Sequence, residues 1–352
     1  MLYLNIDEIL VNEELTMIEA MQVLDNAPEK VLFVANEGKL IAAITDGDIR
    51  RWILRKGNLD AKVKDIANYH PKYLFEKDKA IAKEYMRECS VEALPIVDEN
   101  MQILSVALEN DGELDNRKKL NIPVVIMAGG LGTRLYPYTK ILPKPLIPIG
   151  EIPIVEHIIN RFTRSGSNKF FLIVNHKKNM IKAYFNEIEK NYEVAYIDED
   201  KPLGTGGGLS LLKGKINATF ILSNCDILIE EDYEKMYNFH KKEKNLITMV
   251  CSVKNIKIPY GVIEINENGE IENMKEKPEV SFFINTGMYV VESIVIDELE
   301  DNKAIGFPDI IEKYKLVGEK IGVYPISENA WMDMGQLDEM DEMIRRLEKE
   351  EQ

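Results

Sequence analysis

Apolar and polar positions follow a regular alternation from residue 122 onward. Short apolar runs of strand length alternate with segments whose apolar residues recur at helical spacing. "IPVVIMA" is followed by "VEHIINRFTRSG", "KFFLIVNH" by "MIKAYFNEIEK", and "ATFILSNCD" by "DYEKMYNFHKKEK". The alternation predicts βαβ units, and hence an α/β, Rossmann-like fold with a mixed, mainly parallel sheet and helices on both faces. Ligands of such sheets bind beyond the carboxyl ends of the strands.

The first third of the chain contains an internal repeat. "FVANEGKLIAAITDGDIRR" at 33–51 aligns without gaps on "IVDENMQILSVALENDGEL" at 96–114. Each copy predicts a strand, a tight turn, a second strand and a capped helix start, after a helix-like stretch. Two similar units packed together are expected, because each is too small to build a core alone. "NDGELDNRKKLN" is typical of a linker. The expected domains are 1–58, 59–117 and 118–352.

The repeated units resemble a pair of α+β CBS domains, and "AAITDGDIRR" carries the resemblance. It implies that Thr45 and Asp48 hold the ribose of an adenine nucleotide, with Asp111 as the counterpart of Asp48 in the second copy. Leu108 stands there in place of the hydroxyl. Thr45 and Asp48 equally suit a helix N-terminus, where side-chain oxygens cap free amides. Nucleotide sensing and structural dimerisation therefore both stay open, and a homo-oligomer formed through this pair is expected.

Charge and composition exclude several classes of partner. The formal net charge is -16 and no basic stripe offsets it, which argues against nucleic acid. No apolar run approaches the roughly 20 residues that span a bilayer, and "MLYLNIDEIL" is no signal peptide. The three scattered cysteines suit a reducing compartment. A cytoplasmic protein without a membrane partner is expected. Nucleotides remain compatible, because backbone amides can hold phosphate in an acidic protein.

"MAGGLGTRL" follows the first strand of the α/β part. Gly129, Gly130 and Gly132 let the backbone approach a charged ligand and point amides at it. Thr133 adds a hydroxyl, and Arg134 adds a planar cation suited to phosphate oxygens. The segment is neither a Walker loop nor the GxGxxG fingerprint.

Ten residues after Arg134, Lys144 stands between Pro143 and Pro145, which stiffen its backbone. Together, "GGLGTRLYPYTKILPKPLIPIG" resembles the signature of the sugar-1-phosphate nucleotidyltransferases, the nucleotide-sugar pyrophosphorylases. The resemblance extends from about residue 122 to the end of the chain and implies a GT-A-like catalytic domain. It implies catalytic roles for Arg134, Lys144 and Asp226. No left-handed β-helix repeat is found up to "LEKEEQ", so an acetyltransferase activity is not expected.

Further segments fit the same family in order. "PLGTGGGLSLL" is a second Gly-rich loop, as needed where a backbone packs against a nucleobase and ribose. The nucleotide-binding residues implied are Met127, Ala128, Gly129, Gly130, Gly132, Thr133, Pro202, Gly204 and Thr205. "FILSNCDI" places Asp226 at a strand end, where a carboxylate can hold Mg²⁺, although such an Asp is commonly a turn or helix cap. The resemblance implies Asp226 and Asp333 as Mg²⁺ ligands, with Mn²⁺ expected to substitute.

The resemblance also implies a sugar-phosphate site. Its residues are Tyr260, Gly261, Glu276, Lys277, Asn285 and Thr286. Glu276 matches a carboxylate that accepts hydrogen bonds from sugar hydroxyls, and Lys277 matches a lysine on the sugar's phosphate. "FINTGMYV" is expected to place Asn285 and Thr286 at a sugar-facing turn.

The activity implied is transfer of a nucleotidyl group from a nucleoside triphosphate to a sugar 1-phosphate, with release of pyrophosphate. A CBS pair with this short catalytic domain resembles the glucosamine-1-phosphate guanylyltransferases of legionaminic acid biosynthesis, which implies GTP and glucosamine 1-phosphate. Mannose- or heptose-1-phosphate guanylyltransferases and uridylyltransferases are the alternatives within the class. A glycosyltransferase would usually carry D-x-D, where this chain has "NCD". A regulatory CBS protein with a non-catalytic second domain is the alternative outside it.

Overall fold

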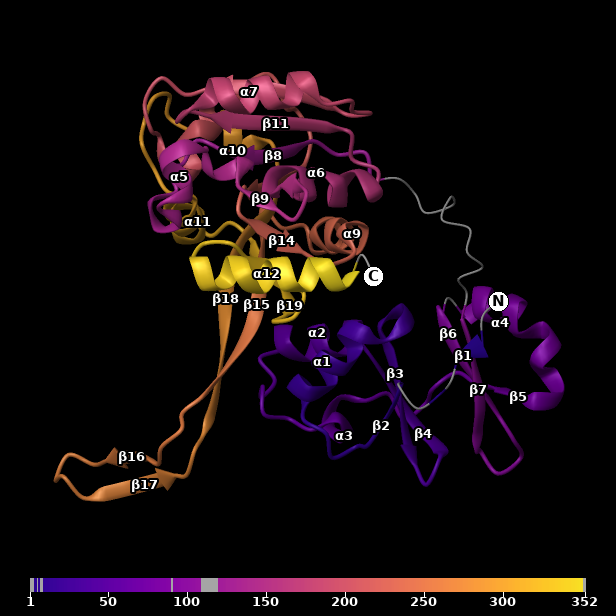
Figure 1. Cartoon of the computed structure of the whole chain (residues 1–352). Helices are drawn as coiled ribbons and strands as arrows, with labels where there is room; N and C mark the ends of the chain where they lie inside the picture. Colours follow the sequence, from indigo (N-terminus) through magenta and orange to yellow (C-terminus); the bar gives the residue numbers. More distant parts are fainter. Residues whose placement is uncertain (1–2, 5, 7–8, 90, 109–119, 351–352) are drawn as a thin grey trace. The chain divides into compact units, whose positions relative to one another are not determined.

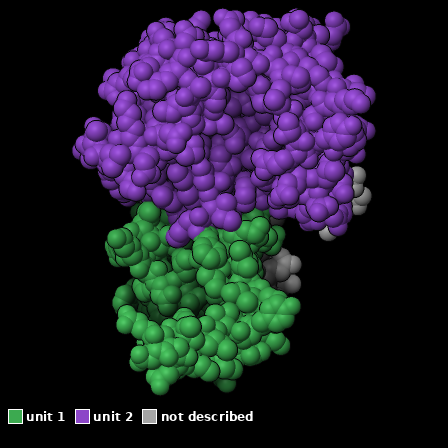
Figure 2. All heavy atoms as spheres, turned by 90° about the vertical axis from the view of Figure 1, so that its left-hand side faces the viewer, with its two compact units in different colours: residues 1–117, 254–282, 327–329 green, residues 118–253, 283–326, 330–352 purple. Residues whose placement is uncertain are grey.

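The structure is a computed structural model and describes residues 3–4, 6, 9–89, 91–108 and 120–350 (Figure 1). Asp111 and most of the expected linker lie outside these residues. The chain divides into two compact units, coloured separately in Figure 2. The first unit comprises 1–117, 254–282 and 327–329, and the second comprises 118–253, 283–326 and 330–352.

The first unit contains two sets of elements that share a strand, a helix and two further strands in the same order. The first set is β2 (Leu10–Val11), α1 (Met17–Asn26), η2 (Pro28–Lys30), β3 (Val31–Asn36), β4 (Lys39–Thr45), α2 (Asp46–Leu54) and α3 (Val63–Ile66). The second set is β5 (Leu74–Phe75), η3 (Glu76–Ile81), α4 (Ala82–Cys89), β6 (Ala93–Val97) and β7 (Ile103–Leu108), with β1 (Tyr3–Leu4) beside β7. In each set the first strand is parallel to the second, and the second is antiparallel to the third. The repeated strand, helix and antiparallel strand pair are thereby confirmed. The helix start expected after β7 lies outside the described residues, and the CBS resemblance stays a prediction.

The two sets meet at their hairpin turns. The amide of Leu40 donates to the carbonyl of Met101 (2.9 Å), and the amide of Ile103 donates to that of Gly38 (3.0 Å). These backbone hydrogen bonds join the two hairpins directly. The expectation that the two copies pack together is confirmed.

Thr45 is the N-cap of α2, as the capping interpretation predicts. Its hydroxyl accepts from the amide of Asp48 (3.1 Å), and the Asp48 carboxylate accepts from the amide of Thr45 (3.0 Å). This reciprocal pair is a capping box, which satisfies two amides that the helix leaves unbonded. The nucleotide-binding role of Thr45 and Asp48 stays a prediction.

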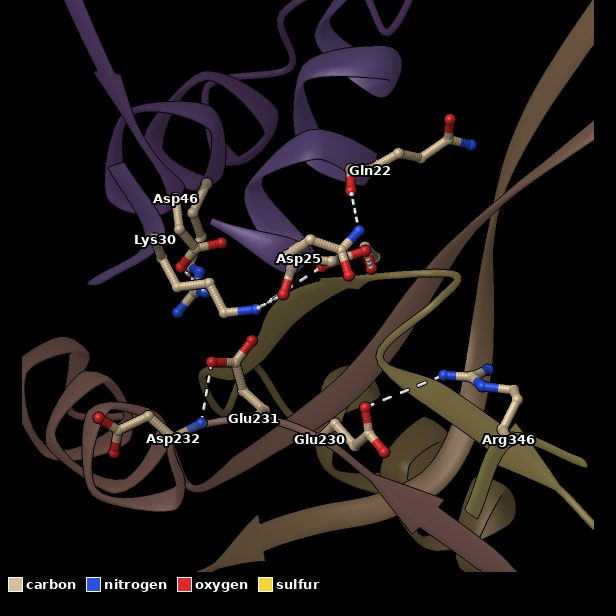
Figure 3. A network of polar contacts seen from close by, with 11 residues as sticks. Gln22, Asp25, Lys30, Asp46, Glu230, Glu231, Asp232 and Arg346 are labelled. Atoms are coloured by element: carbon tan, nitrogen blue, oxygen red, sulfur yellow. Dashed lines mark hydrogen bonds and ion pairs between the residues drawn. The ribbon is translucent and has the colours of Figure 1, made fainter. Parts of the chain in front are cut away.

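The short segment 327–329, which begins at the last residue of β19 (Ile321–Ser327), also belongs to the first unit. The Ser327 hydroxyl donates to the carboxylate of Asp25, and the Lys30 ammonium donates to the Asp25 carbonyl at 2.9 Å (Figure 3). Burial raises the pKa of Asp25. A carboxyl group at the end of α1 is thus largely removed from water and held by hydrogen bonds.

The second unit is built on a seven-stranded mixed sheet. Its order is β12 (Glu193–Asp198), β11 (Lys169–Val174), β8 (Val124–Met127), β13 (Phe220–Asn224), β18 (Glu279–Val291), β15 (Ile247–Lys257) and β19 (Ile321–Ser327). β12, β11, β8 and β13 pair in parallel, and β13 pairs antiparallel with β18. The mixed α/β sheet is confirmed, and its parallel part contains the strands that end at the predicted loops.

Helices cover both faces of this sheet. The longer ones are α6 (Ile154–Arg164), α7 (Lys178–Glu187), α9 (Tyr233–Glu243), α11 (Phe307–Leu316) and α12 (Leu337–Glu350). The shorter ones are η4 (Thr133–Leu135), α5 (Tyr138–Ile141), η5 (Lys144–Leu146), α8 (Gly204–Gly207), η6 (Gly208–Leu212) and α10 (Ile294–Asp297). Two-stranded pairs are formed by β9 (Pro148–Ile149) with β10 (Ile152–Pro153), and by β14 (Ile227–Ile229) with β20 (Trp331–Asp333).

Alternation along β8 divides the interior into two cores. Val124 and Ile126 belong to the core with α6, α7 and α12, whereas Val125 belongs to the core with α10 and α11. Successive side chains of a strand point to opposite faces, so a strand covered on both sides is apolar throughout. On the first face, Glu230 forms ion pairs with Arg161 of α6 (2.9 Å) and Arg346 of α12 (3.9 Å; Figure 3).

Phe162→Ala tests the packing of the first core. Phe162 of α6 is fully buried, and its ring stacks on Tyr233 with centroids 4.5 Å apart. We expect the substitution to lower the free energy of unfolding by about 3–5 kcal/mol, because it leaves a cavity. Leu316→Ala is the control, since Leu316 is 80% exposed, and it should change stability by less than about 0.5 kcal/mol. Urea denaturation measures both, and similar effects would contradict the assigned core.

Candidate active site

A cavity of about 350 Å³ lies at the carboxyl ends of β8 and β13 in the second unit. All the expected nucleotide-binding residues except Ala128 line it, together with Arg134, Lys144 and Asp226. Met127 and Asn224 are 97 residues apart in sequence and meet there because the parallel strands β8 and β13 end at one edge of the sheet. Ala128 is fully buried, and its amide donates to the carbonyl of Ile173 at 2.8 Å. The prediction that Ala128 binds the nucleotide differs from the structure because its side chain packs in the core with Val124 and Ile126.

The loop after β8 turns at Gly132. Its φ of +65° lies in the left-handed region, and a Cβ there would lie 2.8 Å from Thr139 Cγ2 and 3.0 Å from Lys144 Cβ. The Thr139 hydroxyl donates to the Gly132 carbonyl at 2.9 Å. Leu135 is buried and anchors the loop, while Arg134 is exposed in the cavity lining. Glycine is thus required at 132 by both conformation and space.

Lys144 and Asp226 form an ion pair inside the cavity. The ammonium contacts Asp226 Oδ2, and the two side chains are only 13% and 12% exposed. Burial lowers the pKa of Lys144, but the carboxylates of Asp226 and Asp333 outweigh this effect, so that the pKa is raised. Lys144 therefore carries its positive charge at neutral pH.

Asp333 lies beside Asp226 across a strand pair. Ile227 is opposite Asp333 in the β14–β20 pair, and the amide of Met334 donates to the carbonyl of Asp226 at 2.8 Å. Burial, followed by the charges of Asp226 and Glu339, raises the pKa of Asp333 to about 6. Two carboxylates from distant segments are therefore held together against their mutual repulsion.

These carboxylates fit a magnesium ion. Mg²⁺ is commonly held by one or two carboxylates plus phosphate oxygens of a substrate. Burial and then the charge of Asp226 raise the pKa of Asp333, and a cation would compensate for both effects. Among the described residues, no group of three or more His, Cys, Asp or Glu side chains could hold a metal. A metal here would thus depend on ligand atoms from the substrate.

The second Gly-rich segment packs closely against another part of the chain. Gly204 has a φ of +77°, and a Cβ there would lie 2.7 Å from the carbonyl oxygen of Ile305. The amides of Gly206 and Gly207 donate to the same carbonyl (3.0 and 3.1 Å), and Thr205 Oγ1 accepts from the amide of Phe307 (3.0 Å). Some of these glycines are therefore needed for backbone packing, while Gly204 and Thr205 also line the cavity.

Glu199 is a cavity residue that the sequence interpretation missed. It directly follows β12, is 5% exposed, and its Oε1 has no hydrogen-bond partner within the described chain. A Cβ on Gly129 would lie 2.8 Å from Oε2, and one on Gly208 would lie 2.5 Å from Oε1, so these glycines make room for the carboxylate. Burial raises the pKa of Glu199. Its position directly after a parallel strand could have indicated a cavity residue. The surrounding "DEDK", however, is also typical of a solvated turn.

Asn224 and Cys225 line the cavity as well and were not predicted. Cys225 is 5% exposed, and burial followed by the charge of Asp226 raises the pKa of its thiol to about 12. Such a thiol stays protonated and is a poor nucleophile at neutral pH.

The structure does not bring the expected sugar residues into this cavity lining. Tyr260, Gly261, Glu276 and Lys277 belong to 254–282 of the first unit, around the antiparallel strands β16 (Val262–Ile265) and β17 (Ile271–Lys275). All four are exposed, and a Cβ on Gly261 would lie 3.0 Å from the Glu276 carboxylate. These residues form a group of their own.

Asn285 and Thr286 lie within β18, and the expected turn at these residues is wrong. The Thr286 hydroxyl is buried and donates to the carbonyl of Val250 (2.8 Å), and Asn285 Nδ2 donates to the Tyr289 hydroxyl (2.7 Å). Gly287, with a φ of +87°, packs on Asn224 and provides the local irregularity inside the strand. Thr286 therefore has a partner in the neighbouring strand β15, and Asn285 has one within β18, so both polar side chains are accommodated in a continuous strand.

The fold and cavity define an α/β protein with a Gly-rich loop, a buried ion pair and two adjoining carboxylates. The model of the nucleotidyl transferase family matches residues 123–350, and the chain belongs to this family. The matched range covers the second unit together with the interposed segments of the first.

Individual relatives agree with the family. The bifunctional protein GlmU of Methanococcus maripaludis (strain C5) is 32% identical over 220 residues, which cover 60% of this chain and 51% of that protein. The mannose-1-phosphate guanyltransferase of Saccharomyces cerevisiae is 33% identical over 224 residues, covering 60% of this chain and 61% of that protein. The chain thus spans between 51% and 61% of the length of these curated relatives.

A solved structure shares the fold. The crystal structure of HddC from Yersinia pseudotuberculosis aligns with a TM-score of 0.51 and 24% identity, covering 64% of this chain and 99% of that one. Throughout the described ranges, we find no helix with the length and apolarity needed to cross a membrane.

Asp333→Asn tests how far burial and the charge of Asp226 disfavour the ionised form of Asp333. The pKa of Asp333 is raised to about 6 from about 3.9 in an unfolded chain. Its contribution to stability is therefore full below about pH 4 and lost as the pH rises through about 6. Asparagine cannot ionise, so we expect the variant to be more stable than the wild type by about 2 kcal/mol at pH 8, and by less at pH 5.

Urea denaturation in EDTA measures this difference. Asp338→Asn is the control, because Asp338 is an exposed carboxylate at the start of α12. A variant that is no more stable than the wild type at pH 8 would show that burial and the neighbouring carboxylates do not disfavour the ionised form of Asp333.

Proposed function

We propose that this chain is a sugar-1-phosphate nucleotidyltransferase. The convergence of the first Gly-rich loop, Arg134, Lys144 and Asp226 on one cavity, with Asp333 adjoining, is the observation that supports it most. In the proposed reaction, a phosphate oxygen of the sugar 1-phosphate attacks the α-phosphorus of a nucleoside triphosphate. A new P–O bond forms there, and the bond between the α-phosphorus and the bridging oxygen breaks. Pyrophosphate leaves with that electron pair.

This reaction demands alignment and charge neutralisation more than a covalent nucleophile. A phosphate monoester is already an oxyanion near neutral pH, so no side chain has to remove a proton from it. The amides of the first loop and Arg134 face the phosphates that leave as pyrophosphate. Lys144, which carries its charge at neutral pH, orients phosphate oxygens from the Asp226 side of the cavity. The high pKa of Cys225 agrees with a mechanism without a thiolate.

Asp226 and Asp333 are the proposed magnesium ligands. Bound Mg²⁺ would stabilise negative charge on the phosphate oxygens in the transition state. The carboxylates contribute by holding two negative charges in a largely buried place, where Lys144 compensates only one of them. This surplus of negative charge favours a cation.

Glu199 supports guanine as the base. An ionised carboxylate only accepts hydrogen bonds, and that of Glu199 is buried with one oxygen unpartnered. Guanine offers two adjacent donors, N1–H and the 2-amino group, which match the two oxygens of a carboxylate. Adenine, cytosine and uracil each place an acceptor beside the donor on the same edge. The relatives named as mannose-1-phosphate guanyltransferases, and HddC, which was solved with GMP-PN, agree with GTP as the donor.

For the acceptor we propose glucosamine 1-phosphate, with mannose 1-phosphate as the nearest alternative. The resemblance to the glucosamine-1-phosphate guanylyltransferases of legionaminic acid biosynthesis supports the former, and the names of the yeast and other relatives support the latter. The exposed group formed by Tyr260, Gly261, Glu276 and Lys277 is the proposed sugar-recognition segment.

Pyrophosphate release tests the proposed reaction. We expect the full chain with Mg²⁺ to release pyrophosphate from GTP and glucosamine 1-phosphate in a matrix of four triphosphates and common sugar 1-phosphates. Asp226→Asn should lower kcat by about 100-fold or more, because the site loses a charge that stabilises the bound cation. Asp338→Asn, in an exposed carboxylate of α12, should retain activity. If no combination of triphosphate and sugar 1-phosphate yields pyrophosphate, the proposed nucleotidyltransferase activity is refuted.

Glu199→Gln tests the assignment of the base. An amide replaces one of two acceptors by a donor, so we expect kcat/KM for GTP to fall by about tenfold to 100-fold. The same change should favour UTP relative to GTP, since uracil offers a donor beside an acceptor. Asp200→Asn is the matched control, because Asp200 is exposed and does not line the cavity. Equal losses for all four triphosphates would show that Glu199 does not read the base.

A further inference from the structure

Lys177 binds the end of a helix that precedes the catalytic lysine. It lies in the connection between β11 and α7, with a φ of +51° in the left-handed region. Its ammonium donates three hydrogen bonds, to the backbone carbonyls of Thr139 (2.9 Å), Lys140 (2.7 Å) and Ile141 (3.0 Å). These are the last three carbonyls of α5 (Tyr138–Ile141).

The sequence explains why two of these carbonyls, those of Thr139 and Ile141, need an external donor. Helix carbonyls normally accept from the amide four residues later. For Thr139 and Ile141 that residue is Pro143 or Pro145, and proline has no amide hydrogen. Within α5, the carbonyl of Tyr138 accepts from the amide of Leu142 at 3.1 Å. The two prolines that bracket Lys144 thus remove the donors that would complete the helix end, and Lys177 supplies them.

The geometry leaves Lys177 no role in binding substrate directly. An ammonium has three donors, and all three are used by the α5 carbonyls. A cation at a helix C-terminus also interacts favourably with the partial negative charge there. Lys177 is therefore committed to holding the backbone of α5.

The end of α5 in turn contacts the cavity residues. The Thr139 hydroxyl donates to the carbonyl of Gly132 at 2.9 Å, which ties α5 to the first Gly-rich loop. The chain runs from Ile141 to Lys144 in three residues, so a shift of the helix end moves the Lys144 backbone with it. Lys144 reaches Asp226 with a side chain that is only 13% exposed, and thus has little space to compensate.

The same connection also contacts a second cavity residue, Glu199. Asn175, two residues before Lys177, donates from Nδ2 to the backbone carbonyl of Glu199 at 3.0 Å. One short segment after β11 therefore contacts both the backbone of the proposed base-reading carboxylate and the helix that leads to Lys144.

We propose that Lys177 is a positioning residue for Lys144, an inference that rests on the proposed nucleotidyl transfer. By closing the end of α5, Lys177 sets the distance between Lys144 and Asp226 and keeps the first Gly-rich loop against α5. Lys177 acts on the reaction through the backbone of 139–144 alone.

A first experiment requires no turnover. Hydrogen exchange of the amides of Leu142, Leu146 and Ile147, which are bonded to nearby carbonyls, is compared in the wild type, Lys177→Met and Lys178→Met. We expect exchange about tenfold faster in Lys177→Met, because the helix end loses its external donor. Lys178→Met is the matched control: Lys178 is the next residue and lies 3.6 Å from Asp198. Unchanged exchange in Lys177→Met would overturn the proposal.

A second experiment uses pyrophosphate release by the full chain. Lys177→Met should lower kcat/KM by about tenfold or more, because a small misplacement of a catalytic group slows the reaction strongly. Lys177→Arg keeps a cationic donor and should recover most of the loss, and Lys178→Met should match the wild type. If Lys177→Met does not fold, Lys177→Arg and the control still measure how sensitive kcat/KM is to this donor.

A double variant separates positioning from a general structural role. In a Lys144→Arg background, Lys177→Met should cost less than about threefold, because the residue through which it acts is already altered. A loss that stays about tenfold in that background would show that Lys177 acts independently of Lys144 and would overturn the proposal. A wild type without turnover refutes the proposed function, and the exchange experiment then still decides whether Lys177 holds the helix end.

Discussion

The candidate site depends on holding two carboxylates together in a largely buried place. Asp226 follows β13, and Asp333 ends β20, more than 100 residues later in the chain. Burial and then the charge of Asp226 raise the pKa of Asp333, and the charge of Lys144 offsets part of this effect. Leaving one partner of such a cluster unpaired is costly, so the surrounding backbone has to be rigid. The β14–β20 pair and the hydrogen bond from Met334 to Asp226 provide that rigidity.

Glycines and prolines determine how closely the other segments approach this cluster. Gly132 allows Thr139 and Lys144 to pack on the loop, and Gly129 and Gly208 make space for the carboxylate of Glu199. Pro143 and Pro145 stiffen the backbone around Lys144, but they also remove two amides from the end of α5. Lys177, in the loop after a different strand, donates hydrogen bonds to the carbonyls that these prolines leave without an amide partner. The prolines after α5 thus leave backbone carbonyls without amide donors, and a lysine from a distant segment supplies the missing donors.

Much of the second unit could be predicted from its alternation of apolar and polar positions. The pattern indicated the strands, the covering helices and the loops at the strand ends, and most of the nucleotide set lines one cavity. The turn at Asn285 and Thr286 was wrong because hydrogen bonds to Val250 and Tyr289 keep these residues in β18. Glu199 was missed because acidic residues after a strand are usually solvated. Lys177 was missed because a lysine beside another lysine gives no sign of its acceptors.

The sequence by itself determined the periodicity of the sheet, the repeat in the first unit and the loop chemistry, since each depends on neighbouring residues. The sequence also determined the backbone effects of Gly132 and of the two prolines around Lys144, because these effects are local. Only the tertiary structure decided which charges meet: Lys144 with Asp226, Asp333 beside both, Glu199 in the cavity and Lys177 at the end of α5. Such pairings depend on strand order and on burial, which change the energy of a charge far more than its sequence neighbours do.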